Sequence, residues 1–364
     1  MTMTTIQPAV RFFLGANTPG GFLGYLNDLY DCKDGWQATL IKSGPGTGKS
    51  SLMRRVLEEM TAAGYEAEVI CCSSDPHSLD GLVFREQKLC LFDATSPHVM
   101  EPKYWGAVDS ILPLDSCIDR EKLAPYRDEV IAVVDACADA HKRCCGFLGA
   151  AANLLHDSAR IAGQFTDVDK VLRSARRFSD REFGPPQGRG REWRRFLSAV
   201  TPEGIVTFHG TLCALCPRIV SLEDEYGVAA PLFLKEVRDL ALEADLELFT
   251  CACPVQPQKL EHLLIPSLGL GLTTSNSFHK ADFPVYRRIH AARFTDADGL
   301  RSKKQILSFN RRAARELVNE AISIAGAAKN IHDTIESYYK QAMDWESVDL
   351  MTDAVVDRFL RAAK

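Results

Sequence analysis

Hydrophobic and polar residues switch between strand-like and helix-like patterns along the first part of the chain. Short apolar runs at 37–42, 66–72 and 88–93 have the length of buried strands. Residues 48–63 lie between the first two runs and carry apolar side chains at helical spacing, ended by Gly64. Because alternating strand and helix patterns are typical of parallel strands joined by crossovers, this region predicts an α/β core with a parallel sheet. A loop-rich stretch is expected between the second and third runs.

A long helical pattern follows this core. Within residues 119–178 the apolar side chains recur at intervals of three and four, as one buried helix face requires; they include Val130, Val133, Val134, Cys137 and Ala138. Residues 300–364 show the same kind of pattern. We therefore expect each core to carry an appended helical hairpin.

The sequence contains an internal repeat of about 180 residues. Residues 11–21 reappear as residues 194–204, with identical residues at seven of eleven positions. Residues 54–98 also align without a gap with residues 235–279, at an offset of 181. Collinear matches of this kind indicate a duplicated unit, so we expect two tandem domains with P-loop-like α/β cores, the second one degenerate.

The repeat sets the expected domain boundaries, each domain being a core followed by a helical segment. These are core 9–115 and helices 119–178 in the first domain (9–183), and core 193–299 and helices 300–364 in the second (193–364). Residues 184–192 between them are rich in glycine and proline, which break both helices and strands. We expect this stretch to be the linker.

The composition is that of an ordinary globular protein, with 46% hydrophobic and 25% charged residues. This balance excludes a disordered or fibrous chain. The net charge of −5 gives no general attraction to nucleic acid or to anionic membranes. Residues 1–8 lack the basic start and apolar run of a secretory signal, and no apolar run approaches the ~18 residues of a membrane span. We expect a cytoplasmic protein without membrane association.

One motif in the first domain points to specific chemistry. Residues 43–51 follow the strand at 37–42 and open the helix at 48–63. Apart from Ser43 at the first glycine position, they match the P-loop, whose backbone N–H groups bind the phosphates of a nucleotide. The residues expected to bind the nucleotide are Gly44, Pro45, Gly46, Thr47, Gly48, Lys49, Ser50 and Ser51.

The motif also assigns roles to individual side chains. Lys49 is expected to reach the β- and γ-phosphates, and the Ser50 hydroxyl to bind Mg²⁺. P-loop proteins hold the metal with a second acid at the end of a nearby apolar strand, which here is Asp93. Asp75, just past the second strand, is a candidate for orienting the attacking water, and a turn-forming aspartate is the alternative. The glutamate that follows this acid in many ATPases is absent, since Ala94 stands there.

The second domain lacks these groups at the corresponding positions. Its counterpart of the loop, residues 221–227, has lost the glycines and carries three carboxylates, which we expect to repel phosphate. The replaced pairs are Lys49 and Ala230, Asp75 and Gln256, and Asp93 and Thr274. We therefore expect the second domain to fold but not to bind nucleotide by this mechanism.

Two further predictions follow from comparing the copies. His98 is retained as His279, which favours a structural histidine over one that contacts the γ-phosphate. Arg287 or Arg288 is a candidate for an arginine finger that acts on the nucleotide of the first domain, although a solvated basic turn is favoured.

Two other groups of residues have competing explanations. Basic residues between 173 and 195 could bind phosphate backbones, but no nucleic-acid fold signature accompanies them, so a solvated helix end is favoured. The pairs Cys213 with Cys216 and Cys251 with Cys253 have partial metal-ligand spacing. Because the second pair lies in a strand-like run whose side chains alternate between faces, we favour free, buried thiols.

Together the motifs resemble an uncharacterised bacterial family of tandem-duplicated P-loop NTPase proteins, described as ATPase-like. The resemblance spans nearly the whole chain and rests on Phe13–Pro19, Gly44–Ser50, Cys72–Asp75, Ser78–Gly81, Asp93–His98 and His156-Asp157. It implies an ATPase-like protein on account of the P-loop, with no established substrate. Members often carry a recognisable P-loop in both copies, and the second copy here departs from that pattern.

These inferences lead to one functional expectation. We expect Mg²⁺-dependent binding and hydrolysis of ATP in the first domain, with Lys49, Asp75 and Asp93 as catalytic residues. ATP is favoured over GTP because the base-recognition motif of GTPases is not found in the sequence. A kinase that transfers the γ-phosphate to a small molecule and a nucleotide sensor without turnover are the alternatives. The acceptor, the protein partner and the oligomeric state stay open.

Overall fold

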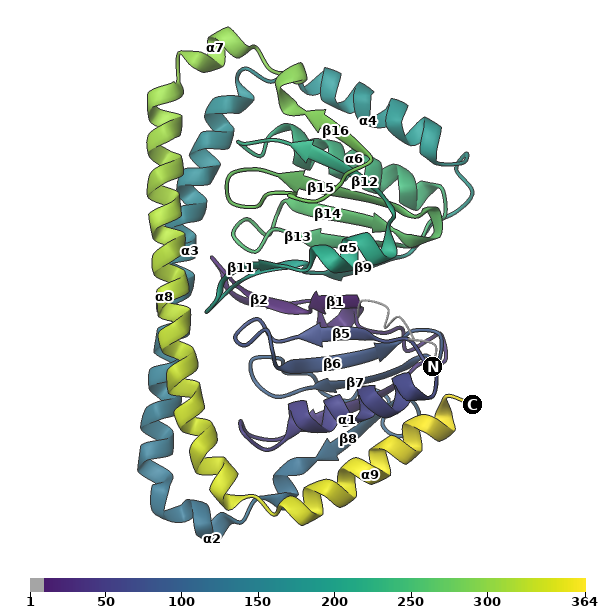
Figure 1. Cartoon of the computed structure of the whole chain (residues 1–364), viewed down its shortest axis with the longest axis vertical. Helices are drawn as coiled ribbons and strands as arrows, with labels where there is room; N and C mark the ends of the chain where they lie inside the picture. The colour runs from purple at the N-terminus through teal and green to yellow at the C-terminus, as the bar shows by residue number, and fades with distance from the viewer. Residues whose placement is uncertain (1–9) are drawn as a thin grey trace, which may run out of the picture. The chain divides into compact units, whose positions relative to one another are not determined.

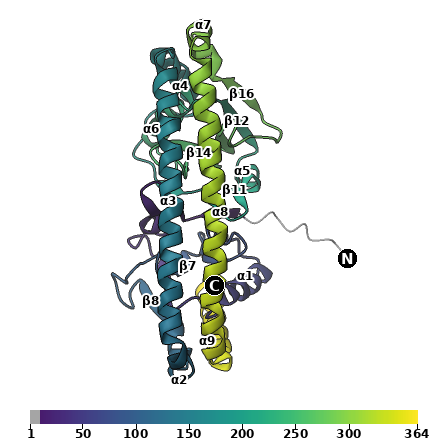
Figure 2. The same cartoon turned by 90° about the vertical axis from the view of Figure 1, so that its left-hand side faces the viewer.

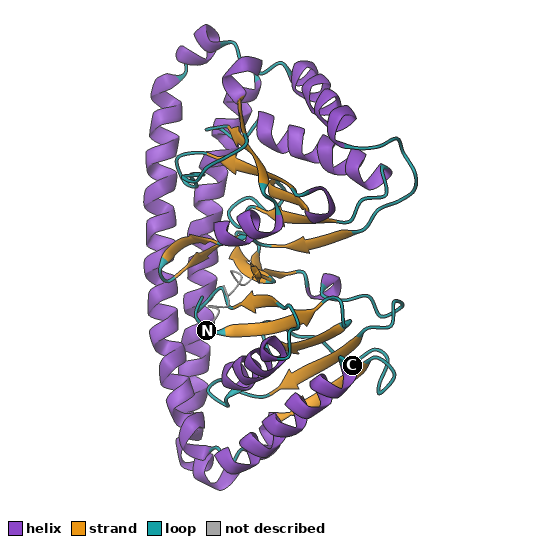
Figure 3. Ribbon diagram, turned by 45° about the vertical axis from the view of Figure 1, so that its right-hand side comes forward, coloured by secondary structure: helices purple, strands orange, loops and turns teal. Residues whose placement is uncertain are grey.

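The computed structural model describes residues 10–364, which form two compact units. Unit 1 contains residues 17–21 and 144–322, and unit 2 contains residues 10–16, 22–143 and 323–364. Each unit is built around one six-stranded sheet flanked by helices (Figures 1 and 3). The fold is therefore α/β with two similar cores, consistent with the tandem repeat in the sequence.

The sheet of unit 2 has the strand order β1-β5-β6-β7-β4-β8. Its strands are β1 (Val10–Phe13), β4 (Gln37–Lys42), β5 (Glu68–Cys71), β6 (Leu79–Phe84), β7 (Leu89–Asp93) and β8 (Asp109–Pro113). The strand β4 is parallel to β7 and β8, and β1 is parallel to β5. Helix α1 (Lys49–Ala62) follows β4 and buries Leu52, Met53, Val56 and Met60.

The strand β6 corrects the expectation of a parallel sheet with a loop-rich stretch. It is antiparallel to both β5 and β7, so the sheet is mixed. A turn that contains Lys88, with a φ of 54°, joins it to β7 as a hairpin. The strand was missed because it begins with Leu79, Asp80 and Gly81, and both aspartate and glycine are depleted in strands. Its place between two partner strands outweighs this local preference.

The sheet of unit 1 has the order β9-β13-β14-β15-β12-β16. Each strand occupies the place of its counterpart in the order β1-β5-β6-β7-β4-β8 of unit 2. Its strands are β9 (Glu192–Arg195), β12 (Arg218–Glu223), β13 (Leu248–Ala252), β14 (Leu260–Ile265), β15 (Leu270–Ser275) and β16 (Arg287–His290). Helix α6 (Ala229–Glu243) follows β12 as α1 follows β4. A short helix, α5 (His209–Leu215), precedes β12. The two-stranded sheets are β2 (Gly15–Thr18) with β3 (Gly21–Gly24), and β10 (Ser198–Thr201) with β11 (Gly204–Thr207).

Two long helices, α3 (Arg127–Gly163) and α8 (Lys304–Ala342), lie side by side and run antiparallel (Figure 2). In unit 2, Cys137 Sγ lies 3.7 Å from the carbonyl O of Ala328. In unit 1, Cys144 Sγ lies 3.4 Å from the carbonyl O of Ala321. Short helices α2 (Arg120–Leu123) and α7 (Ala297–Arg301) precede them. Among the described residues, no helix combines the length and apolar character needed to cross a membrane.

The helices that follow the long ones differ from the expected hairpins. Helix α4 (Val168–Glu182) belongs to the first sequence copy but packs on α6 in unit 1, where the Phe178 and Phe233 ring centroids are 5.7 Å apart. Helix α9 (Trp345–Ala362) belongs to the second copy but packs on α1 in unit 2, with an Arg55–Asp353 ion pair of 2.6 Å. The units therefore differ from the expected domains 9–183 and 193–364.

Candidate functional site

The loop at 43–48 joins β4 to α1 in unit 2, at the carboxyl end of a parallel strand. Gly46 and Gly48 have φ values of 69° and 87°, in the left-handed region that residues with a Cβ rarely adopt. Gly48 is the N-cap residue, and α1 begins at Lys49. The predicted order of strand, loop and helix is present. Ser51, the last residue of the predicted motif, is exposed on α1.

The Lys49 side chain folds back over the loop. Its Nζ donates to the carbonyl O of Ser43 at 3.1 Å and to that of Gly44 at 2.5 Å. The same Nζ lies 3.5 Å from Asp93 Oδ2. Thr47 Oγ1 donates to the Gly44 carbonyl at 2.9 Å, and Ser43 Oγ is buried with no hydrogen-bond partner among residues 10–364. The ammonium group therefore bridges the loop and the end of the neighbouring strand.

Asp93 lies where the sequence predicted the second acid. It ends β7, the parallel neighbour of β4, and is in register with Ile41. Its Oδ1 accepts a hydrogen bond from the Thr95 N–H at 2.9 Å, which orients the carboxylate. Thr95 Oγ1 in turn accepts from the Ser43 N–H at 3.3 Å. The segment after β7 is thereby tied to the start of the loop.

Asp75 lies on a turn after β5. Its carboxylate accepts hydrogen bonds from the His77 N–H at 3.1 Å and the Ser78 hydroxyl at 3.2 Å, and lies 3.4 Å from Lys329 Nζ. Burial alone would raise the pKa of Asp75, but the His77 N–H and the charge of Lys329 outweigh it and lower the pKa. The carboxylate is therefore ionised at neutral pH and is a weak base.

The same turn also reaches the start of α1. Ser50 Oγ accepts a hydrogen bond from the Leu79 N–H at 3.0 Å, and Leu79 directly follows Ser78, which donates to Asp75. Three of the predicted residues, Lys49, Ser50 and Asp93, thus lie close together, and Asp75 is connected to them through one short turn.

Sequence reasoning missed the residues of α8 and α9 that cover this loop within unit 2. A Cβ on Gly46 would lie 2.7 Å from the carbonyl O of Glu336, closer than real Cβ contacts. The other close approaches are Gly44 to the Tyr339 ring and Gly48 to the Trp345 ring. The absence of a Cβ at these glycines therefore also allows α8 and α9 to pack closely against the loop. No local signal reveals this, because these helices come from the other copy of the repeat.

His98 has a partner away from the loop. Its Nε2 lies 3.1 Å from Asp80 Oδ2, and its ring meets Phe22 edge-on with centroids 4.9 Å apart. Burial alone would lower the pKa of His98, but the Asp80 carboxylate raises it well above the ordinary value. This buried ion pair fits the structural role that the sequence favoured.

No known protein family, curated protein or solved structure matches this chain. The resemblance to tandem P-loop proteins therefore stays a prediction.

The corresponding loop of unit 1 binds a carboxylate of its own. This loop joins β12 to α6, and Asp224 aligns with Ser43 of the first copy. Asp224 Oδ1 accepts hydrogen bonds from the N–H groups of Tyr226 at 3.2 Å and Gly227 at 3.0 Å, and Oδ2 accepts from the Ala230 N–H at 2.8 Å. The Asp224 side chain is buried. Backbone donors at the start of α6 are thus satisfied by a side chain of the loop.

This arrangement corrects two expectations about the second copy. Gly227 aligns with Gly46 and keeps the left-handed conformation, with a φ of 65°, so one glycine of the loop survives. The three carboxylates are also compensated, since Asp224 is bound by the loop and the other two form ion pairs. These are Glu223 with Arg288 at 2.6 Å and Glu225 with Arg311 at 3.3 Å. The loop is occupied rather than simply repulsive.

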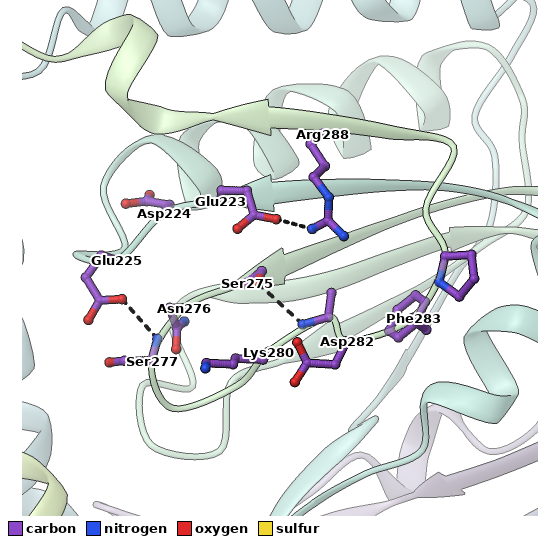
Figure 4. Close-up of a pocket in the computed structure, with 12 residues that line it drawn as sticks. Glu223, Asp224, Glu225, Ser275, Asn276, Ser277, Lys280, Asp282, Phe283 and Arg288 are labelled. Atoms are coloured by element: carbon purple, nitrogen blue, oxygen red, sulfur yellow. Dashed lines mark hydrogen bonds and ion pairs between the residues drawn. The ribbon is translucent and has the colours of Figure 1, made fainter.

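A cavity of about 660 Å³ opens beside this loop, at the carboxyl ends of β12 and β15 (Figure 4). Glu223, Lys280, Asp282 and Arg288 contribute charged groups of both signs to its lining. Arg288 is already paired with Glu223 there, and Arg287 is exposed on β16. The arginine-finger hypothesis for these two residues stays a prediction.

The remaining sequence candidates differ in part from expectation. The cysteines are free; Cys216 and Cys251 are buried, whereas Cys213 is exposed. In the basic segment, Arg195 is fully buried in β9 and Arg176 forms a 2.6 Å ion pair with Glu236, so the segment is not one solvated surface.

Proposed function

We propose that unit 2 binds a nucleoside triphosphate with Mg²⁺ at the loop formed by residues 43–51 and hydrolyses its γ-phosphate, with ATP as the nucleotide. One observation carries this proposal. The Lys49 ammonium lies between the carbonyls of its own loop and the Asp93 carboxylate, at the carboxyl ends of the adjacent parallel strands β4 and β7. This is the edge at which open α/β sheets bind their ligands.

The loop offers what a polyphosphate requires. Left-handed glycines at 46 and 48 let the backbone curl, and α1 adds the positive end of its dipole. Lys49 would exchange its two carbonyl acceptors for phosphate oxygens, which are stronger acceptors because they carry charge. Gly44, Pro45 and Thr47 would form the wall of the loop.

The residues beside Lys49 also fit a magnesium ion. The Ser50 hydroxyl and the Asp93 carboxylate are the oxygen donors that Mg²⁺ prefers. The Thr95 N–H holds the Asp93 carboxylate in a fixed orientation. When bound, Mg²⁺ neutralises negative charge on the β- and γ-phosphates.

Asp75 and Lys329 complete the site. The Asp75 carboxylate would accept a hydrogen bond from the attacking water, and its lowered pKa suits orienting that water better than removing its proton. Lys329, which α8 brings to Asp75, would place a positive charge near the transferring phosphoryl group. Unit 1 has no counterpart, because Asp224 fills its loop.

Thermal melting with ATP or GTP, each with and without Mg²⁺, tests binding. A ligand at one hundred times its Kd adds about 2.7 kcal/mol to the free energy of unfolding. We expect MgATP to raise the Tm of the wild type but not of K49A. The matched control is K42A, which removes a lysine that pairs with Glu101 outside the loop. Equal stabilisation of K49A and the wild type would contradict the proposal.

Phosphate release from [γ-³²P]ATP tests turnover in the same proteins. Free labelled phosphate from wild type and K42A, but not from K49A, is the expected result. Transfer of the label to a metabolite would show that the protein is a kinase and not a hydrolase. Tight nucleotide binding without phosphate release would show that it is a nucleotide sensor.

A further inference from the structure

Three side chains of metal-ligating type meet inside unit 1. Glu261 and His262 are neighbours on β14, and His279 follows β15. All three are buried, and their ligand atoms lie within 4.8 Å of one another. Among residues 10–364 they form the one cluster of three or more such groups.

Two of the three ligand–ligand distances match the coordination sphere of a small cation, and the third is within 4.8 Å. The Nε2 atoms of His262 and His279 are 3.5 Å apart, and His262 Nε2 lies 3.4 Å from Glu261 Oε2. A tetrahedral metal with bonds of about 2.0–2.2 Å separates its ligand atoms by about 3.3–3.6 Å. Two ring nitrogens at 3.5 Å make at best a weak hydrogen bond, so a cation between them satisfies both better.

Neighbouring side chains hold two of the ligands. Thr273 Oγ1 donates to the Thr274 carbonyl at 3.3 Å and so accepts from the Nδ1–H of His262, 2.9 Å away. This leaves a lone pair on His262 Nε2, the atom that faces His279. Ser198 donates to Glu261 Oε2. Second-shell hydrogen bonds of this kind orient metal ligands and fix their tautomers.

Two buried imidazole nitrogens near the cluster have no hydrogen-bond partner among the described residues. His279 is 6% exposed, and its Nδ1 has no hydrogen-bond partner in the described part of the chain. The neighbouring His209, whose ring centroid is 5.3 Å from that of His279, also has an unpartnered buried Nε2. Buried polar groups are normally paired, so these two nitrogens indicate that this part of unit 1 also holds a polar group or water. The metal itself would bind His279 through Nε2, the atom that faces His262.

We propose that Glu261, His262 and His279 bind a divalent transition-metal ion of the zinc type. A cavity of about 80 Å³ is lined by Ser198, Cys253, Glu261 and His279, so it reaches two of the three ligands. Three protein ligands next to a cavity leave a coordination position for water or a small ligand. Sites of this form are typical of catalytic rather than structural zinc.

The first copy of the repeat provides an internal control. Asp80 and His98 align with Glu261 and His279 and form an ion pair of 3.1 Å. Gly81 stands at the position of His262, and a Cβ there would lie 2.9 Å from the Phe92 Cβ. A histidine at 81 is therefore excluded, and unit 2 keeps the pair without the third ligand. The proposal rests on residues of unit 1 alone and does not depend on nucleotide binding.

The test is metal content after stripping with a chelator and reconstitution with Zn²⁺. We expect one zinc per chain by mass spectrometry in the wild type and in H98A, and none above background in H279A or E261Q. Zinc affinity in the two variants should fall by ~100-fold or more. Co²⁺ should give the visible absorption of a tetrahedral site in the wild type and H98A only.

Folding of each variant is checked by circular dichroism. E261Q keeps the volume of the side chain and can still accept a hydrogen bond from Ser198. If H279A does not fold, the zinc content of E261Q therefore tests the proposal. A wild type that retains no zinc and gives no cobalt spectrum would overturn the proposal. Equal loss of metal from H98A and E261Q would overturn it as well.

Discussion

Removing the Asp224 carboxylate should destabilise unit 1 and open an anion site in its loop. This carboxylate is buried and accepts three backbone hydrogen bonds, from Tyr226, Gly227 and Ala230. Each buried donor left unsatisfied costs about 1–3 kcal/mol. We therefore expect D224A to lose at least ~3 kcal/mol of unfolding free energy, measured by urea denaturation.

The isosteric variant D224N separates shape from charge. Its carbonyl oxygen can still accept from Tyr226 and Gly227, but an amide NH₂ would face the Ala230 N–H. We expect it to lose ~1–3 kcal/mol, less than D224A.

Phosphate provides the decisive comparison. In D224A the freed N–H groups can bind an anion, so phosphate at ten times its Kd should restore about 1.4 kcal/mol. The wild type, whose loop is filled, should gain nothing beyond a chloride control at equal ionic strength. If D224A is as stable as the wild type, or if phosphate stabilises both equally, the carboxylate does not occupy the loop as described.

Three further predictions concern unit 2. G46A should lower the free energy of unfolding, measured by urea denaturation, by ~2–4 kcal/mol, because a Cβ there meets both a φ of 69° and the Glu336 carbonyl at 2.7 Å. G106A, which has the same φ but open space around the Cβ, should lower it less. Equal losses would show that the contact with Glu336 has no cost. D75N should lower the kcat of phosphate release by ~10–100-fold with little change in KM, and a change in KM alone would refute a role in orienting water. Folding raises the pKa of His98. The His98–Asp80 ion pair therefore makes its full contribution to the free energy of unfolding below about pH 6.5, and this contribution disappears as the pH rises through the folded-state pKa. The stability gap between wild type and H98Q should thus be widest near pH 6 and shrink toward pH 9; a gap independent of pH would contradict the ion pair.

Local features of the fold could be predicted because they depend on short segments. Strand 37–42 and the helix near 48–63 appear at almost the expected bounds, since periodicity and the glycines at 48 and 64 determine them. The approach of Asp93 to Lys49 was also predictable, because parallel strands end at the same edge of a sheet.

Features that depend on distant segments could not be predicted. The amphipathic pattern of α9 shows that the helix is buried but not which core it covers, and its contact with α1 belongs to the other copy. Asp224 was predicted to repel phosphate because the sequence does not show where its carboxylate points. The cluster of Glu261, His262 and His279 was not predicted because His279 is 17 residues from His262 in the sequence, and only the folded sheet brings them together.

Isothermal titration of the full chain with MgATP counts the nucleotide sites and measures their affinity. We predict one binding site per chain in the wild type and in K42A. Affinity in K49A should be at least ~10-fold weaker, because a hydrogen bond to a charged group is worth about 1.5–3 kcal/mol. K49A binding as tightly as K42A would show that the nucleotide does not bind at the loop of unit 2. Two sites per chain would contradict the single site expected when Asp224 fills the loop of unit 1.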